Sequence, residues 1–389
     1  MRHIAVAAGV AVIALLPVLP AAGATGCGGL LQPKCPPPYS TSAPDPGGDQ
    51  DAGLTVPPPA GKLFGFNTNL WRQTANGGDY VPFEVTRSSR AGSQVLRTTV
   101  TWASFATGPS QPLGGSPVTL ARLDELYQRA SAAGMQLDLV MSNAPLWATA
   151  YASCTGLAVY TPRCAPVRQG DRLYPTVAHL QDLSNFVTAL GERYPGAIFE
   201  TWNEPNFDQG PQAVSGSFIG QMQCAVWQAA KALTQPSMVL SAAFSPYDSA
   251  AATKAYMDAF YATGGACFDR LSVHTYNGIT RRFGADSPLA GEMQIYRDAR
   301  AGAGDTRPMW VTEFGFSSGT RSGEVSEGQQ DQLTRWQYNK LLTMPDVEAA
   351  LVHTLRDDSN ATYGWLRSNG SAKPVYCDFT QQAGDPACP

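Results

Sequence analysis

Short apolar runs rich in β-branched and aromatic residues alternate with longer runs of helical period from residue 62 onward. This alternation is typical of βα units and predicts a parallel sheet. Eight runs are candidate strands, at residues 63–70, 95–102, 136–142, 198–204, 237–244, 270–276, 309–315 and 349–355. A (β/α)8 barrel has eight strands and accommodates a chain of about 330 residues when it carries insertions. The pattern therefore predicts an α/β protein with a single (β/α)8 TIM barrel domain at residues 61–389.

Helical period and capping residues support the segments between the strands. Thr119 is expected to cap one helix, and apolar residues repeat at helical spacing from 180 to 190. Ser326 and Gln329 form the sequence pattern of a capping box. The long insertion at 147–175 is expected to form an ordered wall beside the carboxyl end of the barrel.

The first residues have the features of an export signal. A basic start is followed by an apolar run from Ile4 to Leu19 and then by small residues up to Ala24. We expect a signal peptide at 1–24 and a secreted, extracellular protein. The apolar run contains two prolines and is short for a membrane span of about 20 residues, so no stable membrane insertion is expected. A surface-attached lipoprotein, modified at Cys27, is the alternative.

Residues 25–60 are expected to form an N-terminal tail or linker, and residues 32–60 within them are crowded with proline, glycine, serine and aspartate. Such a composition buries too little apolar surface to order itself, which indicates a tail or linker. The whole chain carries 27 Lys and Arg against 31 Asp and Glu, with no basic run. This charge balance excludes the usual electrostatic footprint of a nucleic-acid binder. We expect a monomer by default.

Eight cysteines in an exported chain favour disulfides, although the sequence leaves their connectivity open. The spacing suggests four local pairs, Cys27 with Cys35, Cys154 with Cys164, Cys224 with Cys267, and Cys377 with Cys388. A zinc site is the competing interpretation, but the chain has neither a CxxC nor an HExxH motif. We therefore expect no metal and no other cofactor.

Polar side chains gather at the carboxyl ends of the predicted strands, where barrels of this type build their active sites. These residues are Asn67, Asn69, Arg97, Asn143, Asn203, Glu204, His274, Tyr276 and Glu313, with His353 and Arg356 near the end of the eighth strand. Glycosidic cleavage needs two carboxylic groups flanking the bond, and Glu204 and Glu313 fit that need from opposite sides of the barrel. Their separation, which decides between retention and inversion, does not follow from the strands. A serine hydrolase is disfavoured because no GxSxG motif is present.

Three segments resemble the motif set of the clan A glycoside hydrolases, especially families 5 and 39. They are FETWNEPNF at 199–207, LSVHTY at 271–276 and WVTEFGF at 310–316. The resemblance covers residues 62 to about 376. It implies a (β/α)8 barrel that hydrolyses with retention, with Glu204 as the acid/base and Glu313 as the nucleophile.

The same resemblance implies supporting roles for neighbouring residues. Asn203 would contact the sugar 2-hydroxyl, Arg97 and Tyr276 would hydrogen-bond the nucleophile, and His274 belongs to the sixth-strand motif. Many relatives carry a tryptophan at the end of strand eight, whereas this chain reads ALVHTLRDD there. Its role could pass to His353, Arg356 or Trp365. Trp147, which follows Asn143 on the strand-three loop, is the best candidate for a sugar platform.

Together these observations predict a secreted retaining glycosidase acting on a carbohydrate substrate, a polysaccharide or a glycoconjugate. We expect endo cleavage because no second domain that would close the site into a pocket is recognisable. The alternative is a catalytically inactive barrel that serves as an exported carbohydrate-binding or cell-surface protein.

Overall fold

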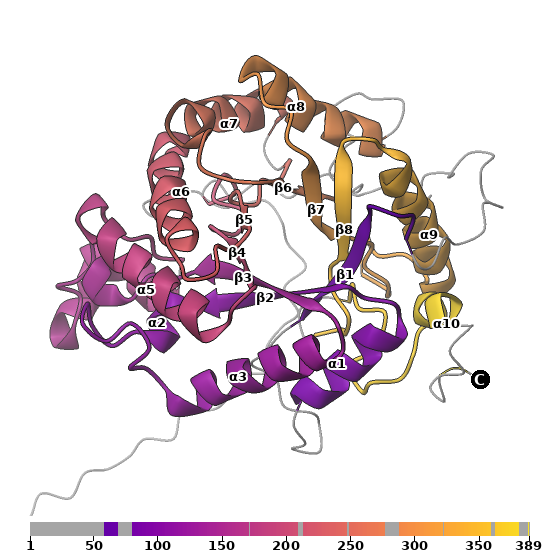
Figure 1. The fold of residues 1–389 in the computed structure, drawn as a ribbon, viewed down its shortest axis with the longest axis horizontal. Helices are drawn as coiled ribbons and strands as arrows, with labels where there is room; N and C mark the ends of the chain where they lie inside the picture. The colour runs from indigo at the N-terminus through magenta and orange to yellow at the C-terminus, as the bar shows by residue number, and fades with distance from the viewer. Residues whose placement is uncertain are drawn as a thin grey trace, which may run out of the picture. The chain divides into compact units, whose positions relative to one another are not determined.

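All eight predicted strands form, and they run parallel in one sheet. The computed structural model describes residues 58–68, 80–170, 172–208, 213–246, 249–276, 288–321, 323–358, 362–380 and 388. The strand order is β5-β4-β3-β2-β1-β8-β7-β6, which makes a nearly closed barrel. Figure 1 shows the strands at the centre with the helices arranged around them. The predicted (β/α)8 fold is therefore confirmed.

The strands are β1 (Leu63–Thr68), β2 (Val95–Thr101), β3 (Gln136–Ser142), β4 (Ile198–Glu200), β5 (Val239–Leu240), β6 (Leu271–Thr275), β7 (Met309–Phe314) and β8 (Val347–Val352). The α-helices are α1 (Tyr80–Arg90), α2 (Trp102–Phe105), α3 (Pro117–Ala132), α4 (Ala165–Gln169), α5 (Leu180–Arg193), α6 (Gly216–Lys231), α7 (Ala250–Gly264), α8 (Pro288–Gly302), α9 (Glu327–Thr343) and α10 (Pro374–Thr380). Short 3-10 helices lie at η1 (Leu146–Ala148), η2 (Gly156–Tyr160), η3 (Pro162–Cys164) and η4 (Val177–His179).

Strands β4 and β5 are much shorter than the sequence predicted. After β4 and β5 the chain stays extended but makes only isolated bridges, Asn203 to Ala243 and Phe244 to Val273. The side chain of Gln223 on α6 takes over part of the missing ladder. Its amide nitrogen donates to Leu240 O at 3.2 Å, and its oxygen accepts from Ala242 N at 3.0 Å. The contact between β5 and β6, called here the β5–β6 seam, therefore relies on a side chain as well as on backbone pairing.

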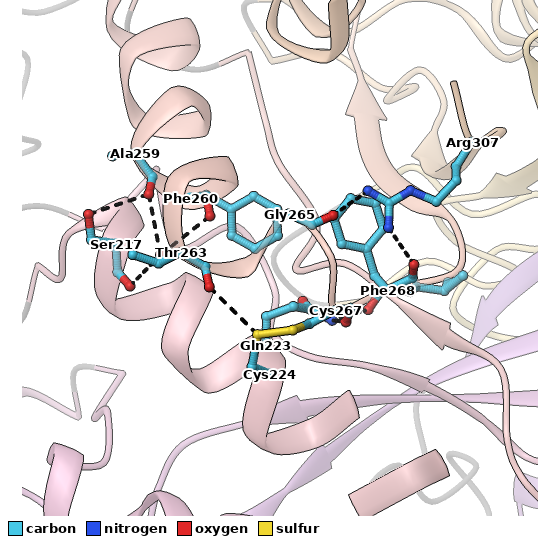
Figure 2. The surroundings of a disulfide bond; sticks show 11 residues. Ser217, Gln223, Cys224, Ala259, Phe260, Thr263, Gly265, Cys267, Phe268 and Arg307 are labelled. Carbon is cyan, nitrogen blue, oxygen red and sulfur yellow. Dashed lines mark hydrogen bonds between the residues drawn. A yellow bond between two sulfur atoms is a disulfide. The ribbon is translucent and has the colours of Figure 1, made fainter. Parts of the chain in front are cut away.

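A disulfide reinforces the same region (Figure 2). Cys224 on α6 is bonded to Cys267, which lies between α7 and β6. Beside it, Arg307 places its guanidinium over the Phe268 ring at 3.6 Å and donates to Phe268 O at 2.6 Å. The disulfide and this cation–π contact tie helices α6 and α7 to the start of β6.

Two other predicted disulfides are present, Cys154–Cys164 and Cys377–Cys388. The predicted Cys27–Cys35 pair lies outside the described residues, as do the expected signal peptide, most of the expected tail and Asn69. None of the helices that the structure describes combines the length and the apolar character that a membrane span requires.

Helix starts follow local capping chemistry. Helix α3 begins earlier than predicted, because Ser116 is its cap and accepts from the backbone N–H of Thr119. The predicted cap at Thr119 is therefore wrong: Pro117 is favoured at the first helical position and moves the start upstream. The capping box of Ser326 and Gln329 on α9 is confirmed.

The barrel interior has an apolar floor with charged side chains next to it. The floor joins side chains from five strands, Val95, Ile198, Leu240, Trp310, Ala349 and Leu351. Side chains on one face of a strand repeat every second residue, so Arg97 follows Val95 and Glu200 follows Ile198 on the inner face. Gly65 lets β1 approach β2 closely, because a Cβ there would lie 2.2 Å from Val95 O. A larger apolar core fills the space between the barrel and its helices.

Candidate active site

The carboxyl ends of the strands bring most of the predicted site residues together. A cavity of about 300 Å³ opens there, and its lining includes Asn67, Arg97, Asn203, Glu313 and His353. The lining comes from β1, β2, β7, helix α1 and the segments after β4 and β8. The volume falls at the lower end of the range typical of small-ligand sites.

Glu313, on β7, is held by several polar groups. Its Oε1 accepts from Arg97 at 2.5 Å, and its Oε2 accepts from the Tyr276 hydroxyl. Two imidazoles also approach Oε2, with Nδ1 of His274 at 3.5 Å and Nδ1 of His353 at 3.4 Å. The side chain is therefore fixed in orientation on every described side except the cavity.

These neighbours favour the ionised form of Glu313. Burial by itself would raise its pKa, but the charges of His274, His353 and Arg97 and the bond from Tyr276 outweigh burial and lower the pKa. Burial and the charge of Glu313 in turn raise the pKa of the Tyr276 phenol well above its usual value, so this hydroxyl stays a proton donor in the bond. Glu313 is thus an oriented carboxylate.

Arg97 connects the site residues to one another. It donates to Asn67 Oδ1 at 2.6 Å and to Asn203 Oδ1 at 2.8 Å, and it forms a two-pronged ion pair with Glu200 at 2.8 and 2.9 Å. Burial opposes the charge of Arg97, but Glu200 and Glu313 more than compensate and raise its pKa. Because the guanidinium engages Oδ1 of Asn203, the amide NH2 of Asn203 is left to face other partners.

Glu204 is positioned mainly by its backbone. Its φ is 45°, which is a left-handed conformation uncommon outside glycine. Its N–H donates to Ala243 O at 3.0 Å. Such a conformation costs about 1–3 kcal/mol and persists where the surroundings impose it, often at functional sites.

Contacts around Glu204 hold it in this backbone conformation. Asn206 bridges to the chain beyond β5, donating to Ser245 O at 2.6 Å and accepting from Ser245 N at 3.1 Å. Arg172, from the insertion after β3, donates to Asn203 O at 2.7 Å. The Glu204 carboxylate itself makes a 2.7 Å bond to Nδ1 of the buried His274.

The two glutamates face each other closely. One oxygen of Glu204, one oxygen of Glu313 and a ring nitrogen of His274 all lie within 4.8 Å of one another. Among the described residues these three are also the one set of carboxylates and imidazoles that could meet at a cation. The guanidinium on Glu313 would repel a cation, so the arrangement suits a carboxylate nucleophile better than a metal ligand.

Three predicted site residues, Asn143, Trp147 and Trp365, make contacts other than the predicted ones. Asn143, with φ 41°, accepts from Leu173 N at 3.1 Å and so anchors the insertion. Trp147 packs edge-on against Trp102, with ring centroids 5.7 Å apart, and is not among the cavity-lining residues.

Trp365 does not take the place of the strand-eight tryptophan, so this prediction is wrong. Its side chain is 1% exposed and lies in the apolar core. Its ring lies 4.3 Å from that of Phe379 on α10 and 4.8 Å from that of Phe66 on β1. The helix that follows it therefore seals it away from the cavity. His353 and Arg356, by contrast, do line the cavity.

Several residues that contribute to the site or its support were missed. Asp138 on β3 and Glu200 on β4 lie beneath it, and Tyr80 and Glu84 of α1 form part of the cavity wall. A signal for the first two existed in the sequence, because each is a charged residue inside an apolar strand run. No comparable signal marked the residues of α1.

A parallel eight-stranded barrel whose carboxyl end brings two glutamates together defines a glycosidase type of site. Residues 177–354 match the sequence model of the family described as glycosyl hydrolase catalytic core. The chain is therefore a glycosidase. No curated protein sequence matches the chain significantly.

Solved structures share the fold. The glycoside hydrolase of family 5, subfamily 18, from Streptomyces cattleya, in complex with Manβ1-4GlcNAc, is 16% identical with a TM-score of 0.58, over 84% of this chain and 83% of that one. A family 39 glycoside hydrolase from Bacteroides cellulosilyticus is 18% identical with a TM-score of 0.55, over 83% of this chain and 63% of that one. A β-glucuronidase from Ruminococcus gnavus is 14% identical with a TM-score of 0.51, over 82% of this chain and 49% of that one. At these identities the likenesses show a shared fold.

Proposed function

We propose that this glycosidase is a secreted, retaining enzyme that cleaves within a polysaccharide or the glycan of a glycoconjugate by double displacement. The observation that carries the proposal is the close approach of Glu204 and Glu313, within 4.8 Å at their nearest oxygens. Retaining enzymes keep their carboxyl groups about 5–5.5 Å apart, whereas inverting enzymes need about 6.5–9.5 Å to admit a water.

In the first step, a Glu313 oxygen attacks the anomeric carbon while Glu204 gives its proton to the departing glycosidic oxygen. The bond from the anomeric carbon to that oxygen breaks, and an ester to Glu313 forms. Arg97 and Tyr276 keep Glu313 ionised and aimed before the attack. The amide NH2 of Asn203 is available to donate to the sugar 2-hydroxyl.

In the second step, Glu204 removes a proton from a water, which attacks the anomeric carbon and releases Glu313. Two inversions give net retention. In the covalent intermediate Glu313 is an uncharged ester, and the residue that gave its proton in the first step is Glu204. The same residue can then act as a base.

The finer parts of the proposal have separate supports. Export is supported by the predicted signal at residues 1–24 and by three disulfides among the described residues. Endo cleavage is part of the proposal, and the order in which the products appear tests it. A carbohydrate is the proposed partner, without nucleic acid and without further subunits.

The first test is release of reducing ends from a panel of plant, fungal and bacterial-envelope glycans, including Manβ1-4GlcNAc oligosaccharides. The purified mature protein is compared with Glu313→Ala. We expect release that the variant abolishes, large fragments among the first products, and retained anomeric configuration in NMR spectra taken at early times. Inverted product would overturn the double displacement, and release of single sugars from the start would overturn the endo mode.

An inactive barrel remains the competing function. It would bind a glycan of the panel without releasing anything, in the wild type and in Glu313→Ala alike. Binding measured by calorimetry on the same glycans separates this outcome from catalysis.

A further inference from the structure

A layer of buried charge lies directly under the catalytic glutamates. Arg97 is 2% exposed, and Asp138 and Glu200 are fully buried. They come from the adjacent strands β2, β3 and β4. With Glu313, three carboxyl groups share one guanidinium, and so much uncompensated charge is costly in a barrel interior.

Glu200 has the partners that a buried carboxylate needs. Both of its oxygens accept from Arg97, at 2.8 and 2.9 Å, in a fork-to-fork pair. Oε1 also accepts from the Ser272 hydroxyl at 3.2 Å, and Ser272 is in turn 2.6 Å from the Thr312 hydroxyl. Glu200 is therefore satisfied as an anion.

Asp138 is in the opposite situation. Neither of its oxygens has a hydrogen-bond partner within the described parts of the chain. The nearest cation is Nε of Arg97, 3.9 Å from Oδ2, and that nitrogen already donates to Glu200. An ionised carboxylate without donors is very costly to bury. Burial, the charge of Glu200 and a hydrogen bond that a protonated Asp138 can give to the Glu200 side chain outweigh the charge of Arg97 and raise the pKa of Asp138 well above its usual value.

We propose that Asp138 carries a proton, and that Glu200 alone, as a carboxylate, orients Arg97 toward the nucleophile. Glu200 is then a positioning residue: it touches no substrate and acts through the guanidinium. The proposal goes beyond the proposed function, because it concerns charge states in the layer beneath the site.

The geometry explains why one proton matters. The fork with Glu200 uses Nε and one terminal nitrogen of Arg97, which leaves the other terminal nitrogen to meet Glu313 and Asn67. An ionised Asp138 would compete with Glu200 for Nε, which lies 3.9 Å from Asp138 Oδ2 and 2.8 Å from Glu200 Oε2. Around Glu313 the other titratable groups are Tyr276, His274, His353 and Glu204, and none of them contacts Glu200 or Asp138 in the described residues.

The protonation state of Asp138 can be measured without an activity assay. Infrared spectra at pH 8 of protein with ¹³C in its aspartate carboxyls should show a protonated carbonyl band that shifts with the label. Asp138→Asn should remove that band, whereas ¹³C in the glutamate carboxyls should leave it in place. The proposal is overturned if no aspartate-labelled band is present in the wild type or if Asp138→Asn leaves the band intact.

The positioning role is tested by kinetics on whichever glycan the wild type cleaves. Glu200→Gln should lower kcat by about 100-fold, the typical result of a small misplacement of reacting groups, with little change in KM. Asp138→Asn, which replaces one neutral group by another, should lower kcat far less. In an Arg97→Lys background, Glu200→Gln should cost little more, since residues acting as one unit are not additive.

Fully additive losses, or a larger loss from Asp138→Asn than from Glu200→Gln, would overturn the positioning role. Circular dichroism establishes that each variant is folded. If Glu200→Gln does not fold, the infrared result still decides which carboxyl holds the proton. Because that result needs no substrate, it stands or falls separately from the proposed glycosidase reaction.

Discussion

The two sides of the active site hold their glutamates in different ways. Glu313 is the next-to-last residue of a six-residue strand that is buried throughout, and its side chain is contacted by an arginine, a tyrosine and two histidines. Glu204 follows a strand of only three residues, and within the described parts of the chain its carboxylate bonds to His274. Its position depends instead on a left-handed backbone and on the bridge made by Asn206.

This difference matches the two chemical tasks that we propose for Glu313 and Glu204. A nucleophile must be ionised and aimed at one point, so strong charged contacts to the carboxylate serve it well. An acid/base must gain and lose a proton in each cycle, and strong charged contacts would fix it in one state. The left-handed backbone and the bond to His274 orient the Glu204 side chain without a guanidinium on its carboxylate.

The largest expected effect comes from removing the nucleophile. Glu313→Ala should lower kcat by on the order of 10⁶-fold, the scale seen when a covalent nucleophile is removed from a hydrolase. Glu348→Gln is a matched control, because Glu348 pairs with Arg270 at the opposite end of the barrel. Reducing-end assays on both variants measure the contrast, and a mild effect of Glu313→Ala would contradict its role.

Removing the acid/base should be less severe. Glu204→Gln should lower kcat by about 10²–10⁴-fold on a natural glycan, the usual contribution of proton transfer. On an aryl glycoside whose leaving group needs no proton, the first step should be nearly normal and a burst of phenol should appear. Glu192→Gln, on the exposed surface of α5, is the control. Equal losses on both substrates would argue against proton donation.

Removing the hydrogen bond from Tyr276 to Glu313 should shift the pH dependence of kcat/KM. Tyr276→Phe removes one of the influences that lower the pKa of Glu313, so that pKa rises. Because only ionised Glu313 attacks, the acid limb of kcat/KM should move to higher pH, and kcat should fall by about 10- to 100-fold for a lost bond to a charged group. Tyr194→Phe, which removes a hydroxyl bonded to Asp124 far from the site, should change neither.

The smallest effect is expected from loosening the backbone support of Glu204. Asn206→Ala removes both bonds to Ser245 and should lower kcat by about tenfold, equivalent to about 1.4 kcal/mol. The pH of the acid limb should stay where it is, because Glu313 is untouched. Asn185→Ala on the exposed face of α5 is the control. A shifted acid limb in Asn206→Ala would show that the two sides of the site are not separate.

The strands that carry this site, and the positions of the two glutamates at their ends, could be predicted from the sequence. Each strand run contains a buried apolar face, and two motif segments place Glu204 and Glu313 where parallel strands end. The sequence could not give the separation of the two side chains, since that depends on barrel closure. It is the closed geometry that brings β4 and β7 within reach of each other.

Predictions failed where packing decided between equivalent candidates. Trp365 looks like any aromatic near a strand end, yet Phe379 of α10 covers it. Asn143 looks like a substrate contact, yet its side chain anchors a loop. Conversely, Asp138 and Glu200 are charged residues inside apolar strand runs, where a search for strands counts them as interruptions. Only the structure shows that they lie beneath Glu204 and Glu313.

The Cys224–Cys267 disulfide secures the start of β6, so we expect the β5–β6 seam to open first at its carboxyl end. The Glu204–His274 bond joins the segment after β4 to β6, passing over the two-residue β5. Local opening in proteins favours regions with few backbone ladders. Amide exchange at Ala242, bonded only to the Gln223 side chain, should therefore be faster than along β7. If so, heating would part the acid/base from its partner first, and activity would cease at a temperature below the melting of the barrel.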